Sequence, residues 1–206
     1  MKLRDQPFCY PILEHKTVYS GRIFDLVSDT VDLGSDGTVI REYVAHPGSV
    51  AILALDKDDR VAVINQYRHP VKAILWEIPA GLLDVTGEKA LTAAKRELAE
   101  EADLAANRWD LLVDFVTSPG GTNEALRVFL ARDLSKTSQT FHRTEEEAEM
   151  RVEWLPLDEI VAGILAGRFR NPALVLGALA AFAARAADWA PLRATDTPWP
   201  DRPEAV

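Results

Sequence analysis

Residues 81–104, with the sequence GLLDVTGEKALTAAKRELAEEADL, constrain the fold of this chain more than any other segment. Leu91, Ala94 and Leu98 follow one another at spacings of three and four residues, which places them on one face of a helix. Glu88 precedes them, where the positive end of the helix dipole stabilises an acidic residue. The segment therefore predicts a loop followed by an amphipathic helix that packs on a core.

Three glutamates share one sector of this predicted helix. Glu97 lies three residues before Glu100 and four before Glu101, so the three side chains are neighbours on the helix surface. Like charges at such spacings destabilise a helix by about 0.2–0.5 kcal/mol per pair. One interpretation is a solvated acidic face. The other is a set of hard oxygen ligands for Mg²⁺ or Mn²⁺, with Arg96 expected to hold the carboxylate of Glu100.

The composition of the chain narrows its partners and its compartment. A net charge of −9 over 206 residues disfavours nucleic acid as a partner, because phosphate backbones are bound by patches of lysine and arginine. It leaves room for a small phosphorylated ligand whose charge is neutralised by a metal. The single cysteine, Cys9, excludes an intramolecular disulfide and a cysteine-rich zinc site, and it fits a reducing compartment.

Neither a membrane span nor a secretion signal is predicted. The most apolar run, residues 172–184, has 13 residues and is followed by Arg185, which is too short for a bilayer. The first 16 residues lack the long apolar stretch of a signal peptide. We therefore expect a cytoplasmic protein with no membrane partner.

Turn residues and hydrophobic periodicity predict an α+β chain with a mixed β-sheet and helices on both of its faces. Two hairpins are expected where β-branched segments flank the turn sequences GSDG and DKDD, namely 17–33 with 38–46 and 49–55 with 60–68. Further strands are expected at 74–79, 110–116, 125–132 and 150–156, and further helices at 157–167 and 172–187.

These elements divide the chain into three parts. Residues 1–46 are predicted to form a small N-terminal antiparallel β subdomain, and residues 47–187 the main domain. Residues 188–206 are rich in proline and polar side chains, so they are expected to be a mobile tail.

The spacing of residues around the acidic helix resembles the Nudix box. That pattern runs glycine, five residues, glutamate, seven residues and then Arg-Glu-apolar-x-Glu-Glu-x-Gly-apolar. The matching positions are Gly81, Glu88, Arg96, Glu97, Leu98, Glu100, Glu101 and Leu104. The chain departs from the pattern twice: six residues separate Gly81 from Glu88, and Asp103 stands where the last glycine is expected. A left-handed helix end is expected there, and aspartate tolerates it.

The resemblance extends over residues 17–187 and points to the ADP-ribose pyrophosphatase branch of the family. The sequences VINQYRHP before the box, LWEIPAGLLD leading into it and SPGGTNE after it look like that branch. They are most similar to its bacterial dimeric enzymes, in which an N-terminal β subdomain is exchanged between subunits. The resemblance implies a Nudix-type αβα sandwich and a homodimer.

The same resemblance implies roles for the acidic residues. The implied metal ligands are the backbone carbonyl of Ala80 and the carboxylates of Glu97, Glu101 and Glu149. The implied catalytic group is Glu147, with Glu100 and Arg96 beside it and Glu146 as the alternative in the segment 143–150. Arg96 is expected to brace a glutamate. The plain alternatives are packing for Ala80 and a solvated charged loop for residues 143–150.

Substrate contacts implied by the resemblance are Arg41, Arg68, Leu82 and Glu124. Arg41 and Arg68 would face phosphates or adenosine, Glu124 a ribose hydroxyl, and Leu82 would act through its backbone. The alternative for each is a surface or packing role.

The expected function is metal-dependent hydrolysis of ADP-ribose to AMP and ribose 5-phosphate. Two alternatives remain at the level of sequence. The substrate could be another nucleoside diphosphate sugar, or the chain could be a Nudix module that senses a nucleotide without cleaving it. The retention of Glu97, Glu100 and Glu101 favours an enzyme.

Overall fold

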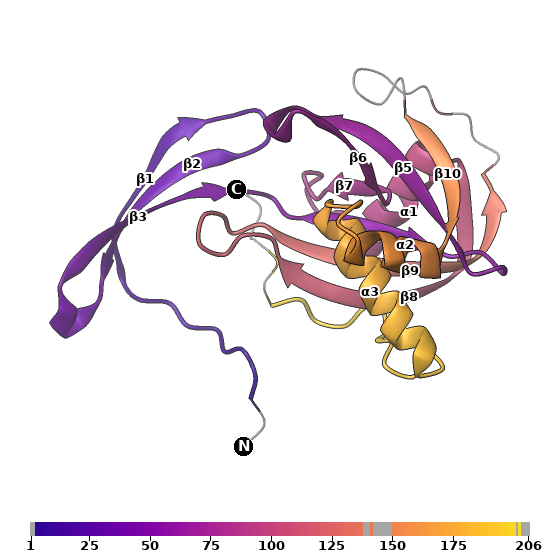
Figure 1. Ribbon diagram of the computed structural model, residues 1–206. Coiled ribbons are helices and arrows are strands. Elements are labelled where there is room, and N and C mark those ends of the chain that lie inside the picture. The colour runs from indigo at the N-terminus through magenta and orange to yellow at the C-terminus, as the bar shows by residue number, and fades with distance from the viewer. Residues whose placement is uncertain (1–2, 138–140, 142–149, 201, 203–206) are drawn as a thin grey trace. The chain divides into compact units, whose positions relative to one another are not determined.

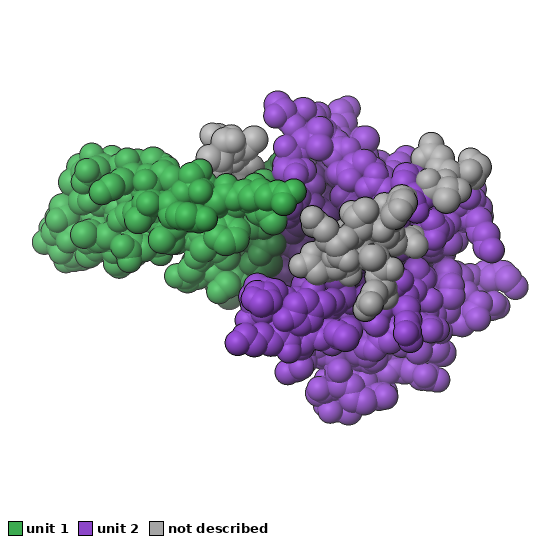
Figure 2. All heavy atoms as spheres, turned by 90° about the horizontal axis from the view of Figure 1, so that it is seen from above, with its two compact units in different colours: residues 1–48, 116–125, 198–206 green, residues 49–115, 126–197 purple. Residues whose placement is uncertain are grey.

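The computed structural model describes residues 3–137, 141, 150–200 and 202. The chain forms two compact units, which Figure 2 shows in two colours. The first unit comprises Met1–Gly48, Val116–Ala125 and Pro198–Val206, and the second comprises Ser49–Phe115 and Leu126–Thr197.

The first unit is built on a three-stranded antiparallel sheet (Figure 1). Its strands are β1 (Ile12–Ser20), β2 (Asp25–Asp32) and β3 (Thr38–Ala45), in the order β1-β2-β3. All nine residues of β1 are exposed. The antiparallel N-terminal sheet predicted from the sequence is confirmed.

The boundaries of these strands differ from the prediction at one turn. The β-branched segment 17–33 divides into β1 and β2, because the backbone N–H of Gly21 donates to the carbonyl of Phe24 over 3.0 Å. A side chain at Gly21 would lie 2.6 Å from the Phe24 carbonyl oxygen, so only glycine fits this turn. The hairpin predicted at GSDG is confirmed, since β2 and β3 pair along their whole length around a 3₁₀ turn at Gly34–Asp36.

The second unit holds two sheets. The strands are β4 (Ser49–Ala54), β5 (Arg60–Arg68), β6 (Ala73–Glu77), β7 (Ala80–Leu82), β8 (Leu104–Val116), β9 (Ala125–Lys136) and β10 (Arg151–Pro156). One sheet has the antiparallel order β10-β5-β6, and the other has the mixed order β7-β4-β9-β8.

The hairpin predicted at DKDD is wrong in one respect. A turn joins β4 to β5, but beyond the single bridge between Leu55 and Val61 the two strands enter different sheets. The reason is that both edges of β4 are occupied, one by the parallel strand β9 and the other by β7. Every residue of β4 is buried, as expected for a strand covered on both faces.

Three helices complete the second unit: α1 (Ala90–Ala102), α2 (Leu157–Leu165) and α3 (Pro172–Ala186). Helix α1 packs on β4, β5 and β7, whereas α3 packs on β4 and β6 and carries α2. Ala51 and Leu53 of β4 share a core with α2 and α3, while Val50 and Ile52 are buried on the opposite face. Helices therefore cover both faces, and the predicted αβα arrangement is confirmed.

The C-terminal segment is bonded to the second unit as far as Thr197. Arg193 and Leu111 of β8 exchange two backbone hydrogen bonds of 3.1 and 2.8 Å. Arg127, only 3% exposed, pairs with Asp114 and donates to the carbonyl of Thr197 over 2.9 Å. How mobile this segment is in solution stays a prediction.

Candidate active site

The acidic helix follows a loop that turns at Gly87. Gly87 has a φ of 79°, which favours glycine, and the N–H of Glu88 donates to the carbonyl of Val85 over 3.0 Å. Helix α1 then starts at Ala90. Its apolar face is the predicted one, with Ala94 and Leu98 fully buried. The turn leaves Glu88 close to the second turn of the helix.

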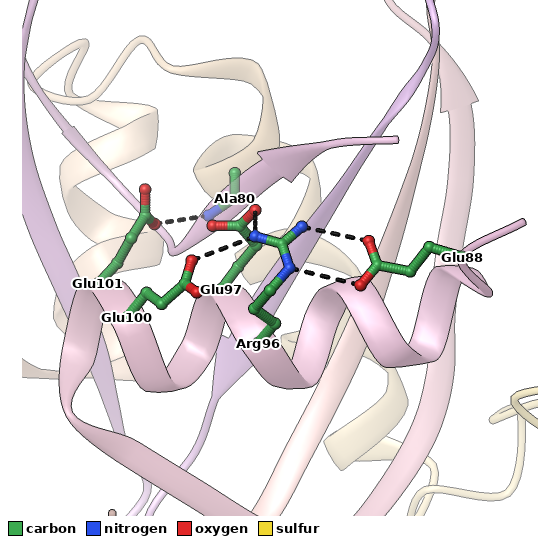
Figure 3. A network of polar contacts seen from close by, with 6 residues as sticks. All are labelled: Ala80, Glu88, Arg96, Glu97, Glu100 and Glu101. Atoms are coloured by element: carbon green, nitrogen blue, oxygen red, sulfur yellow. Dashed lines mark hydrogen bonds and ion pairs between the residues drawn. The ribbon is translucent and has the colours of Figure 1, made fainter. Parts of the chain in front are cut away.

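Arg96 holds three of the glutamates together (Figure 3). Its Nη1 donates to Glu97 over 2.7 Å and to Glu100 over 3.1 Å. Its Nε and Nη2 donate to the two oxygens of Glu88 over 3.4 and 3.2 Å. The hydrogen bond with Glu88 is the main reason that the pKa of Arg96 is raised; burial opposes the shift, and Glu97 adds to it. The contact of Arg96 with Glu100 was predicted, whereas those with Glu88 and Glu97 were not. The positive charge of Arg96 reduces the repulsion between the neighbouring carboxylates.

Glu101 is held by the main chain of another element. It is buried at 5% exposure, and its Oε2 accepts a hydrogen bond of 2.9 Å from the backbone N–H of Ala80 at the start of β7 (Figure 3). A charge-assisted bond of this kind stabilises a carboxylate that has lost its water. Ala80 and Glu101, which are 21 residues apart in sequence, are therefore neighbours at the site.

Gly81 leaves room for Glu97. A Cβ atom placed on Gly81 would lie 1.9 Å from Oε1 and 2.1 Å from Cδ of Glu97, so no other residue fits without moving that carboxylate. Strand β7 and helix α1 thus approach at Ala80–Glu101 and at Gly81–Glu97. Both carboxylates therefore lie against one short strand, and that of Glu101 is hydrogen-bonded to it.

The donor set of this cluster fits a hard divalent cation. The carboxylates of Glu88, Glu97, Glu100 and Glu101 outnumber the guanidinium of Arg96, and all of them offer oxygen. Within residues 3–137 and 150–200, no three acidic, imidazole or thiol side chains already converge on one point as metal ligands. Arg96 and the N–H of Ala80 hold oxygens of the cluster. The predicted carbonyl ligand, Ala80, lies beside Glu101.

A second ion pair joins the last residue of β5 to the last residue of β6. Arg68 donates from Nε to Oε1 of Glu77 over 2.9 Å and from Nη2 to Oε2 over 2.6 Å. Arg68 was predicted as a substrate contact, whereas Glu77 was missed. The available signal was an acidic residue inside the apolar strand sequence ILWEIP.

Three other predicted residues are placed as follows. Leu82 lies in β7, where it pairs with Ser49 of β4. Arg41 belongs to β3 of the first unit, lies opposite Asp29, and donates from Nη1 to the carbonyl of Ile40 over 3.0 Å. Glu124 also belongs to the first unit. Glu146, Glu147 and Glu149 lie outside the described residues, so their roles stay predictions.

Glu124 is held within a small polar cluster of the first unit. Its Oε2 accepts from Thr117 Oγ1 over 2.8 Å, and its Oε1 lies 3.8 Å from Nδ1 of His46. That Nδ1 accepts a hydrogen bond of 3.1 Å from the N–H of Gly48. Burial lowers the pKa of His46, although Glu124 acts in the opposite direction. Because Nδ1 accepts the Gly48 N–H, the neutral imidazole carries its proton on Nε2, a feature that the sequence did not indicate.

The fold and the acidic helix together define a class of protein. Residues 45–174 match the model of the NUDIX domain family, so the chain belongs to that family and the resemblance predicted from its sequence is confirmed. A solved structure titled as an ADP compounds hydrolase superposes with a TM-score of 0.71, covering 90% of this chain and 98% of that one. At 23% identity, that likeness supports the fold alone.

Two relatives are closer in sequence. The chain is 40% identical over 196 residues to an ADP-ribose pyrophosphatase of Mycobacterium tuberculosis, covering 95% of this chain and 94% of the relative. It is 35% identical over 170 residues to a methanol dehydrogenase activator of Bacillus methanolicus, covering 80% and 91%. No helix among the described residues is long and apolar enough to cross a membrane.

Proposed function

We propose that the chain hydrolyses ADP-ribose to AMP and ribose 5-phosphate. The observation that carries this proposal is the pair Glu97 and Glu101, both lying against β7, in a chain 40% identical to an ADP-ribose pyrophosphatase. Hydrolysis adds one water across the phosphoanhydride: a new P–O bond forms, the bridging P–O bond breaks, and the water's proton passes to a base. Retained carboxylates favour this enzyme over a module that senses nucleotides without cleaving them.

The proposal includes a divalent cation, Mg²⁺ with Mn²⁺ as a substitute. The ligands would be the carbonyl of Ala80 and the carboxylates of Glu97, Glu101 and Glu149. When bound, such cations screen the negative oxygens of a diphosphate and lower the pKa of coordinated water. The part played by the protein is orientation, which the contacts of Arg96 and of the Ala80 N–H support.

The remaining roles are assigned by resemblance. Glu147 would accept the proton of the attacking water, with Glu146 and Glu100 as alternatives. Arg68 would bind the diphosphate, Leu82 would contact the ligand through its backbone, and Arg41 and Glu124 would bind phosphate or adenosine and ribose. Hydrogen bonds orient both side chains and support their part: Arg68 donates to Glu77 over 2.6 Å, and Glu124 accepts from Thr117 over 2.8 Å.

A homodimer and a cytoplasmic location complete the proposal. Large apolar side chains are exposed on the first unit: Phe8, Tyr10, Ile12, Leu13, Val18, Tyr19, Ile23, Phe24 and Ile40. Exposed apolar surface of this kind marks an interface, and a second copy of the chain is the proposed occupant.

The single, exposed and unpaired cysteine, Cys9, fits a reducing compartment.

The test is a substrate panel with the purified protein and Mg²⁺. ADP-ribose and other nucleoside diphosphate sugars are supplied at equal concentration, and the nucleoside monophosphate released from each is quantified by chromatography. We expect ADP-ribose to be cleaved with the highest kcat/KM and chelation to abolish turnover. Higher kcat/KM for another sugar would overturn the substrate assignment. Calorimetric binding of ADP-ribose without cleavage would identify a sensor.

A further inference from the structure

The pair formed by Arg68 and Glu77 combines one exposed partner with one buried partner. The side chain of Glu77 is 2% exposed, whereas that of Arg68 is 44% exposed. We propose that Glu77 is a positioning residue, which fixes the guanidinium of Arg68 so that it receives the diphosphate of the substrate. The inference rests on the proposed function, and it adds a residue that the family pattern of the box does not contain.

The register of the hairpin shows that this is not an ordinary cross-strand pair. Glu77 lies opposite Ile64, and Arg68 lies opposite Ala73. Opposed residues share a face of the sheet, so both side chains are on the same face, four residues apart along the strand direction. That offset corresponds to about 13 Å. Arg68 therefore extends back along β6 to reach the carboxylate.

The anchor of the guanidinium is rigid. Glu77 ends β6 and is followed by Ile78, which is fully buried, and by Pro79, whose carbonyl accepts from the N–H of Ile52 over 2.8 Å. The next residue is Ala80, which binds Glu101. Only two residues, Ile78 and Pro79, thus separate the carboxylate that holds Arg68 from the strand that contacts the acidic helix.

The geometry of the pair suits a second anion. Arg68 uses its Nε and Nη2 for Glu77, and its side chain is nevertheless 44% exposed. A guanidinium binds phosphate through two parallel N–H groups, and its planar fork must be oriented for this to happen. A buried carboxylate is a strong orienting group, because separating it from its cation would leave an uncompensated charge.

The alternative is that the pair only stabilises the hairpin. A double-mutant cycle of Glu77→Gln and Arg68→Ala separates the two roles, with KM and kcat for ADP-ribose measured alongside thermal unfolding. We expect Glu77→Gln to raise KM by about tenfold and to change kcat by less than about threefold. In the Arg68→Ala background the same substitution should change KM by less than about twofold.

Three controls keep the outcomes distinct. Arg68→Lys keeps the charge that Glu77 needs but loses the planar fork, so it should raise KM even if Glu77→Gln does not fold. Arg60→Ala removes a guanidinium from the other end of β5, where Arg60 pairs with Asp56 over 2.7 Å, and it should leave KM unchanged. Calorimetric binding of ADP-ribose to the same variants gives a second measure that does not depend on turnover.

The proposal is overturned if Glu77→Gln leaves KM and affinity unaltered, or if it raises KM equally with and without Arg68. It is also overturned if Arg68→Ala binds ADP-ribose normally, and the hydrolase assignment then stands. A parental protein that binds ADP-ribose without cleaving it would instead refute the hydrolase, and the binding cycle would still decide the role of Glu77.

Discussion

The carboxylate of Glu97 occupies the space that a side chain at residue 81 would fill. An ideal Cβ on Gly81 would lie within 2.4 Å of three atoms of that glutamate. Gly81 is therefore needed for close approach between β7 and α1 rather than for an unusual backbone angle. The glycine of the box and its first glutamate act as one structural unit.

Gly81→Ala should displace Glu97 and weaken Mg²⁺ binding by about 10–100-fold, the range found when a group that orients a metal ligand is altered. The measurement is calorimetric titration with Mg²⁺, alongside thermal unfolding to show that the fold persists. Gly120→Ala is the matched control, because a Cβ there meets nothing within 4 Å. Normal Mg²⁺ affinity in Gly81→Ala would contradict this prediction.

Glu101→Gln and Glu147→Gln should fail in different ways. Glu101 is fixed by Ala80, so its substitution should weaken metal binding, and high Mg²⁺ should restore part of the activity. Glu147→Gln should bind metal and ADP-ribose normally and turn over about 10²–10⁴-fold more slowly, as expected for loss of a general base. Steady-state rates and calorimetry on both variants distinguish them. Parental turnover in Glu147→Gln would transfer the role to Glu146 or Glu100.

Asp103 ends helix α1 in the left-handed conformation, with a φ of 55°. Asp103→Gly should raise the free energy of unfolding by about 0.5–1 kcal/mol, because glycine adopts this conformation without strain. Ala102→Gly, one residue earlier and inside the helix, should lower it by at least about 0.5–1 kcal/mol. Urea denaturation measures both. The same sign for the two variants would contradict the assignment of the helix end.

The lowered pKa of His46 predicts a pH-dependent stability. The unfolded chain binds a proton at this residue below about pH 6.5, whereas the folded chain resists it. The contribution of His46 is therefore complete above about pH 6.5 and is lost as the pH falls towards the folded pKa. His46→Asn keeps an acceptor for Gly48 and does not titrate. Its thermal midpoint should fall less than that of the parent between about pH 7 and pH 5, and parallel curves would exclude the effect.

Removal of residues 1–46 should abolish both dimerisation and ADP-ribose binding, because it removes Arg41, a proposed substrate contact, and the exposed apolar side chains of the proposed dimer interface. Light scattering at micromolar concentration gives the mass of the full chain and of the shortened one. A full-length monomer with full activity would rule out the proposed assembly. Tyr19→Glu with Ile40→Glu is a milder change, and it should weaken dimerisation while leaving β1–β3 paired.

Helices were predictable from the sequence because their apolar spacing is local. The ranges 157–167 and 172–187 end within two residues of α2 and α3. Strand pairing was less predictable, since β4 joins β9, which lies more than 70 residues away. The sequence places β4 and β5 next to each other, and nothing local in DKDD shows that distant strands take both edges of β4.

In the candidate site, too, contacts set by local spacing could be predicted and contacts set by distant parts of the chain could not. The contact between Arg96 and Glu100 follows from helical spacing, so it could be predicted. The contact between Arg96 and Glu88 depends on the loop that Gly87 turns, so it could not. Glu77 was missed because its partner, Arg68, comes within reach only through the register of a hairpin.

Residue 80 serves the site through its main chain. The N–H that holds Glu101 belongs to the peptide group, so it is present whatever the side chain at this position is. Alanine scanning skips this residue, and most substitutions that fit the space would keep the bond. Its contribution becomes visible only when the amide itself is altered, as in Ala80→Pro or in an ester linkage between Pro79 and residue 80. Part of this site therefore depends on the path of the backbone and not on the identity of any side chain.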